Sequence, residues 1–166
     1  MKLFYKIFFL LIIVGSAVAQ PFSITSLTEL YAGKDGFIIL NLNDAGFVLR
    51  DLVKSKSAQE AIKSVKKITL IRFSTEELKE DKKAEAMKDG KNFYKQVKNF
   101  RAFDYEEIMS LSQGSNQLRS YYKKNERSDN EFIMTITAEE YNSLIMYLSG
   151  SFTKEEILEI AKSIKF

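Results

Sequence analysis

The residue types in this chain exclude most of the familiar catalytic and metal centres. The sequence contains neither His nor Cys. A Ser–His or Cys–His nucleophile therefore cannot form, and zinc and the transition metals lose the two ligands that they prefer. The glycine-rich loops that bind dinucleotides or nucleoside triphosphates are also missing, since Gly33 and Gly36 lack the partner residues of those motifs. We expect no catalytic residue of these classes, no metal site and no cofactor.

Two short motifs match those of penicillin-recognising serine enzymes. Ser120–Lys123 fits S-x-x-K and Ser128–Asn130 fits S-D-N, but the third motif, K-T-G, is missing. S-x-x-K also occurs at 64–67 and 151–154, so it is a weak signal in a chain rich in Ser and Lys. Because side chains alternate along a strand, Ser120 and Lys123 should face opposite sides of the sheet. This argues against a catalytic Ser–Lys pair.

Neighbouring acidic residues keep a hydrolase based on Asp or Glu open. Two carboxylic acids can share the general acid and general base roles, and the chain has four adjacent Glu–Glu pairs: Glu76–Glu77, Glu106–Glu107, Glu139–Glu140 and Glu155–Glu156. Most of these pairs fall at expected helix starts or turns, where acids commonly cap a helix or face water. Adjacent residues also point in different directions, so a working pair needs acids from two different elements.

The best candidate for a binding surface is the strand face that carries Arg119, Tyr121 and Lys123. Alternation along 117–124 places these three side chains on one face, opposite the apolar side of the strand. An exposed Tyr between basic groups is typical of contact surfaces, although the wet side of any half-buried strand looks the same. We predict a binding surface here and expect Tyr121 to be exposed.

The elements that position these residues begin with alternating helices and strands. Apolar residues at helical spacing predict a helix over 24–32, and the apolar run 37–42 predicts a buried strand. Helices are then expected over 44–53 and 58–65, followed by a strand over 68–73.

The next helix is expected to start at Ser74, which forms a capping box with Glu77. Gly90 is expected to break or kink it before the amphipathic segment 93–100. A second capping box, Thr153 with Glu156, starts a final helix over 153–164.

Between these helices the pattern changes to a period of two. Strands are expected over 105–112, 117–124, 131–138 and 143–149, with turn-like segments between them. Because helices and strands interleave early and strands run together late, the sequence predicts an α+β fold. We expect a four-stranded antiparallel meander, extended by one or two earlier strands, with the helices packed on one face.

The first 19 residues have the pattern of a secretory signal peptide. Lys2 and Lys6 precede the apolar run 7–14, and Ala17–Ala19 is a small-x-small cleavage site. The apolar run is about half of the roughly 20 residues that a membrane-spanning helix needs. We expect cleavage after Ala19, export to the periplasm or the medium, no membrane span in the mature chain, and one α+β domain over 20–166.

Removing this segment changes the charge and the partners to consider. Lys2 and Lys6 leave with it, so the formal net charge falls from +3 to +1. Nucleic-acid binding usually needs clustered positive charge, so we expect no nucleic-acid partner. An exported fold without Cys must also be stable without disulfides.

Three segments, in this order, resemble a known family. They are "ELYAGKDGFIILNL" at 29–42, "KKITLIRF" at 66–73 and "NSLIMYLSGSFTKEEILEIAKSI" at 142–164. Together with the signal peptide they make the chain similar to domain-of-unknown-function family 4252, small exported proteins of bacterial envelopes. The likeness covers roughly residues 27–164. It implies an exported α+β protein, and it carries over no catalytic residue because the family has no assigned activity.

Together these observations favour a non-catalytic exported envelope protein that acts as a binding or interaction module. An envelope protein or a glycan is the expected partner. The alternatives are an Asp/Glu-based hydrolase of an envelope polymer and a regulatory or stress-response accessory protein. A hydrolase would need a concave site with two inward carboxylates about 5–10 Å apart.

Overall fold

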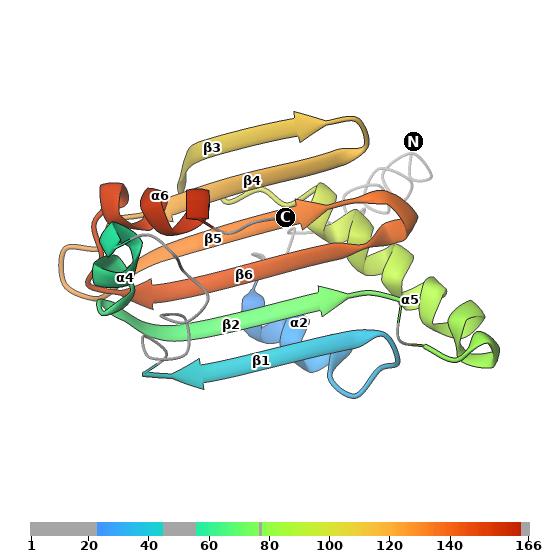
Figure 1. Ribbon diagram of the computed structural model, residues 1–166. Coiled ribbons are helices and arrows are strands. Elements are labelled where there is room, and N and C mark those ends of the chain that lie inside the picture. The colour runs from blue at the N-terminus through green and yellow to red at the C-terminus, as the bar shows by residue number, and fades with distance from the viewer. Residues whose placement is uncertain (1–22, 45–55, 77, 164–166) are drawn as a thin grey trace, which may run out of the picture.

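A computed structural model describes residues 23–44, 56–76 and 78–163. Its centre is a six-stranded sheet in the order β1-β2-β6-β5-β4-β3, in which every neighbouring pair is antiparallel (Figure 1). The strands are β1 (Phe37–Asn43), β2 (Val65–Phe73), β3 (Glu106–Gln113), β4 (Asn116–Lys123), β5 (Asn130–Thr137) and β6 (Ser143–Gly150). The predicted α+β fold is confirmed, because β3 to β6 form the meander and β2 and β1 extend it.

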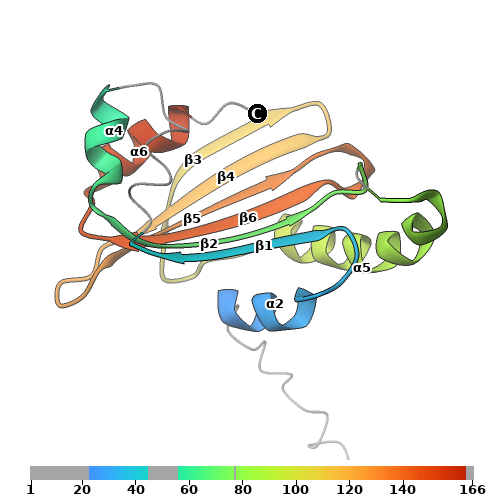
Figure 2. The ribbon, with the colours of Figure 1, turned by 60° about the horizontal axis from the view of Figure 1, so that its bottom comes forward.

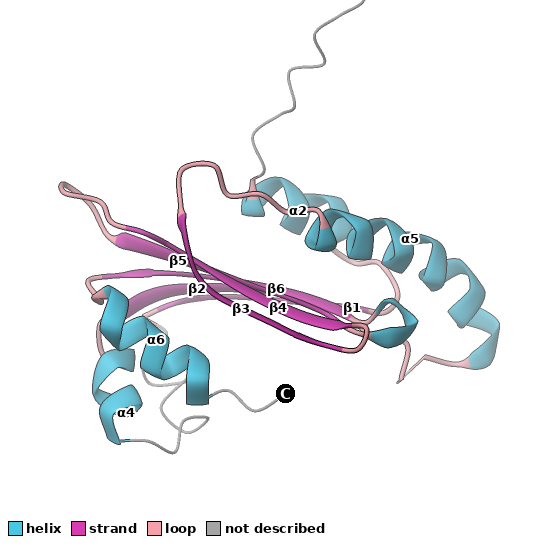
Figure 3. Cartoon of the chain, turned by 90° about the horizontal axis from the view of Figure 1, so that it is seen from above, coloured by secondary structure: helices cyan, strands magenta, loops and turns pink. Residues whose placement is uncertain are grey.

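The helices cover both faces of the sheet, which corrects the expectation that they pack on one. Helices α2 (Ile24–Tyr31) and α5 (Glu80–Lys98) lie on one face, and α4 (Lys56–Ile62) and α6 (Lys154–Ser163) lie on the other (Figures 2 and 3). We call these the α2/α5 face and the α4/α6 face. A short 3₁₀ turn, η1 (Glu139–Tyr141), joins β5 to β6. None of the described helices is long and apolar enough to cross a bilayer.

The inner strands explain the two-sided arrangement, because consecutive residues in them are buried on opposite faces. In β5, Phe132 belongs to the core of the α4/α6 face and Ile133 to the core of the α2/α5 face. In β6, Leu148 belongs to the core of the α4/α6 face and Ile145 to the core of the α2/α5 face. A sheet that is apolar on both sides must bury both sides.

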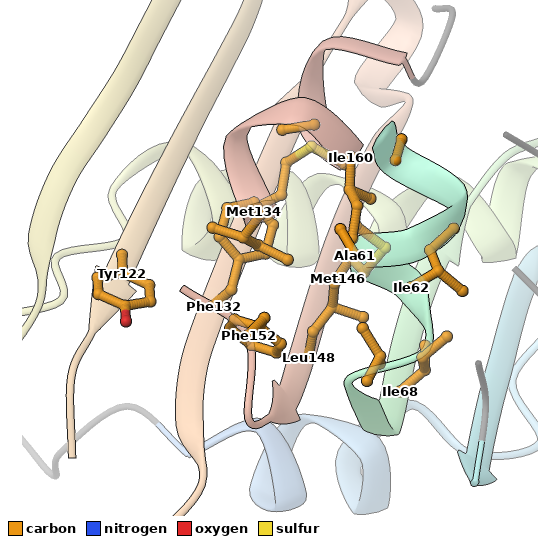
Figure 4. Close-up of a cluster of buried hydrophobic side chains, with 14 of the residues drawn as sticks. Ala61, Ile62, Ile68, Tyr122, Phe132, Met134, Met146, Leu148, Phe152 and Ile160 are labelled. Carbon is orange, nitrogen blue, oxygen red and sulfur yellow. The ribbon is translucent and has the colours of Figure 1, made fainter. Parts of the chain in front are cut away.

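The two cores differ in their side chains. On the α4/α6 face, aliphatic residues and methionines dominate, as Figure 4 shows for Met134, Met146 and Leu148 beneath Ile62 and Ile160. On the α2/α5 face the core is aromatic: the Tyr31 ring stacks on Phe37 with centroids 4.5 Å apart, and Phe93 meets Tyr31 edge-on at 5.0 Å.

Gly90 does not break α5, contrary to the sequence-based expectation. The helix runs without interruption from Glu80 to Lys98, and Gly90 is buried. A Cβ atom at Gly90 would lie 2.1 Å from Cε1 and Cζ of Phe73, so the glycine lets the helix approach the Phe73 ring closely. Packing therefore explains this glycine, and helix termination does not.

The two predicted capping boxes have different outcomes. At Thr153, the hydroxyl accepts a hydrogen bond from the Glu156 amide at 3.2 Å, and a Glu156 carboxylate oxygen accepts one from the Thr153 amide at 2.7 Å. At Ser74 the prediction is wrong, because α5 begins at Glu80 and its N-cap, Lys79, makes no side-chain cap bond. The helix expected over 44–53 lies almost wholly outside the described residues.

Candidate functional site

A cleft of about 760 Å³ opens on the α2/α5 face, at the end of the sheet where β1 and β5 carry polar residues. Its floor is formed by β1, β2, β5 and β6, one wall by the first turns of α2, and the other wall by residues 100–105. Residues 100–105 belong to the loop that joins α5 to β3, and this loop passes beside α2 (Figure 3).

The strand register places the polar floor of the cleft. Asn41 of β1 pairs with Thr69 of β2, which pairs with Tyr147 of β6, so these three side chains form one row across the sheet. One step along the strands, Asn43 pairs with Lys67. Towards the other end of the strands this face is apolar and is buried under α2 and α5. The cleft therefore lies where the exposed polar residues Asn41, Asn43 and Lys67 adjoin the buried part of this face.

Glu131 joins three segments at one edge of the cleft. Its carboxylate accepts hydrogen bonds from the Tyr105 hydroxyl and, at 3.0 Å, from Nδ2 of Asn125. The same Asn125 group donates to the Asp129 carbonyl oxygen at 2.8 Å. Glu131 thus fixes the loop before β3 and the loop after β4 against β5. Both of its oxygens already accept hydrogen bonds, which is a positioning arrangement.

Two tyrosines beside Glu131 titrate above their ordinary range. Burial raises the pKa of the Tyr105 hydroxyl, and the hydrogen bond to Glu131 and the charge of Glu131 raise it further. Burial also raises the pKa of Tyr147, and the Glu131 charge adds to that effect. Both groups are therefore neutral hydrogen-bonding phenols at the edge of the cleft at physiological pH.

The residues predicted to bind, Arg119, Tyr121 and Lys123, do share the α2/α5 face, but they do not form one exposed surface. Tyr121 is only 5% exposed because the Phe100 ring covers it edge-on at 5.2 Å. Its expected exposure is thus corrected: the loop after α5 covers this part of the sheet. Lys123 lies over the Tyr105 ring, with Nζ 5.4 Å from the ring centroid.

Arg119 lines a second, smaller hollow of about 420 Å³ next to the cleft. Residues 101–105 contribute to both hollows, so this short segment forms the wall that they share. Phe103, in the middle of the segment, lines both hollows and is 94% exposed. A fully exposed aromatic ring beside two hollows is an unusual surface feature, since such rings are normally buried or used in contacts.

The adjacent acid pairs serve mainly as structural partners. Glu106 forms an ion pair with Lys154, and a Glu76 carboxylate oxygen lies 3.4 Å from Nη2 of Arg72. Glu139 accepts a hydrogen bond from the Ser115 hydroxyl at 3.0 Å. Glu156 caps α6, as described above. Within the described segments, no group of three or more acidic side chains is arranged to hold a metal ion.

The serine–lysine alternative fails on geometry. Ser120 is fully buried and pairs with Met134 on the α4/α6 face, whereas Lys123 contacts Tyr105 on the opposite face. The sheet itself separates the two side chains. They cannot form a nucleophile–base pair.

Sequence reasoning missed the residues that shape the cleft. Tyr105 and Glu131 are 26 residues apart and meet only through tertiary packing. Alternation does place Glu131 on the same face as Ile133, but it does not say which loop covers that face. The one local signal is Phe103, an aromatic residue between Ala102 and Asp104 in a segment without helical or strand periodicity.

Comparison with known proteins adds a family and no activity. No curated protein and no solved structure matches the chain. The family model described as domain of unknown function DUF4252 matches residues 31–160, which run from the end of α2 to the last turn of α6 and include the whole sheet. The chain therefore belongs to the DUF4252 family.

Proposed function

We propose that this chain is a non-catalytic binding module of the bacterial envelope, and that the cleft on the α2/α5 face holds a short segment of a glycan. The observation that carries the proposal is the cleft itself. Its volume of about 760 Å³ lies within the range of pockets that hold small ligands, roughly 300–1,000 Å³. A protein partner would instead need a broad surface, with about 800 Å² buried on each side.

The lining of the cleft supports a ligand rich in hydroxyl groups. Amide side chains from Asn41 and Asn43, the Thr69 hydroxyl and the Tyr147 phenol can each both donate and accept hydrogen bonds. Phe103 offers an aromatic face at the rim. Sugars present hydroxyl edges and apolar C–H faces, so a mixture of amides, hydroxyls and an exposed ring suits them better than it suits a purely apolar ligand.

The cleft also contains the acids on which the hydrolase alternative depends. Glu29, Asp104 and Glu131 line it. Of these three acids, Glu131 is the one with hydrogen bonds to other described residues. One of its carboxylate oxygens accepts a hydrogen bond from Tyr105 and the other accepts one from Asn125. A carboxylate engaged in this way is suited to holding the site in shape, which favours binding over catalysis.

The binding proposal is tested with glycan arrays and then by titration calorimetry of the purified protein with the best oligosaccharide. We expect Phe103→Ala to weaken binding roughly tenfold or more, because an exposed aromatic contact is lost. Folding should be unaffected since the ring is 94% exposed. Asn41→Ala, also at an exposed position, should weaken binding through lost hydrogen bonds.

Leu111→Ala is the matched control. Leu111 is an exposed apolar residue of β3 outside the cleft lining, so its loss should leave binding unchanged. If Phe103→Ala and Leu111→Ala bind equally well, the cleft is not the site. Release of new reducing ends from a bound glycan, abolished by Glu131→Gln, would instead support the hydrolase.

We also propose that the protein reaches the envelope through its N-terminal signal peptide. The proposal rests on the basic start, the short apolar run and the Ala17–Ala19 site. The intact mass of the protein purified from its native cells tests it. We expect the mass of residues 20–166, whereas the full 19.1 kDa would show that the segment is retained.

A further inference from the structure

The smaller hollow beside the cleft brings together two arginines and a buried tyrosine hydroxyl. Arg119 and Tyr121 come from β4, and Arg101 comes from the loop that precedes β3. Arg119 and Tyr121 are two residues apart on one strand, so their side chains lie on the same face. The hollow, of about 420 Å³, lies on the far side of the 101–105 wall from the cleft.

Neither arginine forms an ion pair with a carboxylate in the described part of the chain. One Arg101 nitrogen donates to the Phe100 carbonyl oxygen at 3.1 Å, which leaves its other donors available. Eight ion pairs join other described residues, including Lys34–Asp89 and Lys66–Asp129. Other described basic residues, among them Lys95 and Arg127, also form no ion pair with a described carboxylate, so what distinguishes these two guanidinium groups is that both line one hollow.

Tyr121 lines the hollow but is only 5% exposed. Its hydroxyl is buried and has no hydrogen-bond partner. An unsatisfied buried polar group normally costs free energy, so natural proteins keep few of them. Burial raises the pKa of this hydroxyl, and nearby Arg119 counteracts part of the rise. The phenol is thus a neutral donor that lacks an acceptor.

The other polar residues of the hollow leave it with a positive balance. Glu107 of β3 lies directly across from Tyr121, and Ser110 lies across from Arg119. Glu107 is the one acid among the residues that line the hollow, against two arginines. Arginine forks match the oxygens of carboxylates and phosphates in a bidentate geometry, and the phenol can add a third donor.

We propose that Arg101, Arg119 and Tyr121 bind an oxyanion, a carboxylate or a phosphate group. Because Arg101, Ala102, Phe103 and Tyr105 line both hollows, the glycan in the cleft can cross this wall and place its acidic group between the arginines. The ligand is then an acidic glycan. That last step rests on the proposed function, whereas the oxyanion site itself does not.

The test uses ¹⁵N-labelled protein and four probes followed by NMR. Inorganic phosphate and acetate report on the oxyanion site alone and distinguish phosphate from carboxylate. A glucuronate-containing tetrasaccharide and its carboxyl-reduced form report on the acidic group within a glycan. We expect the Arg119 side-chain and Tyr121 amide signals to shift with at least one anion, and the acidic tetrasaccharide to bind at least tenfold more tightly than its reduced form. Added NaCl should reduce the difference in affinity between the acidic tetrasaccharide and its reduced form, because salt screens the charge interaction.

Three variants and a control locate the effect. Arg101→Gln and Arg119→Gln should each lower anion affinity at least fivefold. Arg119→Gln should also leave binding of the reduced tetrasaccharide unaffected, because Arg119, unlike Arg101, does not line the cleft. Tyr121→Phe should lower anion affinity while the melting temperature stays the same or rises, because the lost hydroxyl has no partner in the free protein. Arg127→Gln removes the same charge from the exposed loop between β4 and β5 and should change nothing.

The outcomes separate the two proposals. Anion shifts at Arg119 without binding of either tetrasaccharide support the oxyanion site and overturn the glycan proposal. Equal binding of both tetrasaccharides, with no anion shifts, overturns the oxyanion site and leaves the glycan proposal standing. Absence of all binding overturns both, and equal effects of Arg119→Gln and Arg127→Gln overturn the oxyanion site.

Discussion

Glu131 and Tyr105 show how a few side chains shape the cleft. The Tyr105 hydroxyl donates to the Glu131 carboxylate, and Lys123 lies over the Tyr105 ring. These contacts tie the start of β3 to the end of β4 and the start of β5. The wall of the cleft therefore depends on a hydrogen bond to a charged group, which is typically worth more than one between neutral groups.

We expect Tyr105→Phe to lower the free energy of unfolding by about 1.5–3 kcal/mol near neutral pH, the usual worth of a hydrogen bond to a charged group. The native state raises the pKa of Tyr105 above the ordinary 10.0. The Tyr105 hydroxyl therefore makes its full contribution to the free energy of unfolding below about pH 10. This contribution is lost as the pH rises further, because Tyr105 ionises in the unfolded state before it ionises in the native state. Urea unfolding between pH 8 and pH 11 measures this: the difference between wild type and variant should shrink above pH 10.

Tyr94→Phe is the control for this prediction. Tyr94 packs edge-on against Tyr141, and its hydroxyl makes no hydrogen bond to another described residue. Its removal should leave stability near neutral pH almost unchanged. A difference between wild type and Tyr105→Phe that stays constant up to pH 11 would contradict the link to tyrosine ionisation.

At the scale of elements, the two S/T-x-x-E sequences show that a local motif is not enough to start a helix. Thr153 and Glu156 cap each other reciprocally at the start of α6. Ser74 instead accepts a weak hydrogen bond from the Glu76 amide at 3.3 Å, and α5 begins at Glu80. Ser74 follows the last residue of β2, and its amide still pairs with the Gly36 carbonyl at 3.0 Å. This hydrogen bond continues the pairing of β1 with β2 beyond Phe73, so the chain stays extended there and the helix begins later.

This contrast predicts different costs for two similar substitutions. Thr153→Ala should destabilise the protein by about 1 kcal/mol, the usual cost of losing an N-cap side chain. Ser74→Ala should change stability by less than about 0.5 kcal/mol, because its hydroxyl caps no helix. Urea unfolding monitored by circular dichroism compares the two. Equal costs at both sites would show that the Thr153 capping box contributes nothing beyond an ordinary loop contact.

At the scale of the whole molecule, one sheet separates two cores and leaves one end of one face open. Ile71, Phe73 and Ile145 are buried under α2 and α5. Asn41 and Lys67, nearer the other end of the strands, are exposed and line the cleft. Helices cover the sheet where its side chains are apolar, because burial of those side chains stabilises the packing. The polar end is consequently free for a ligand.

Sequence alone determined the order and type of the described helices and strands, the α+β class and the family. It did so because alternation and helical spacing are local properties of the chain. The absence of His and Cys also excluded whole classes of chemistry before any fold was known.

Only the tertiary structure decided which side chains meet. Alternation assigns Tyr121 and Glu131 to a face of the sheet, but it does not say that Phe100 covers the first and Tyr105 bonds to the second. Those contacts join residues far apart in the chain, and they form when a loop without periodicity packs on the sheet. Such long-range packing forms the cleft, the smaller hollow beside it and the two-sided arrangement of the helices. The spacing of apolar residues along the sequence does not encode these contacts.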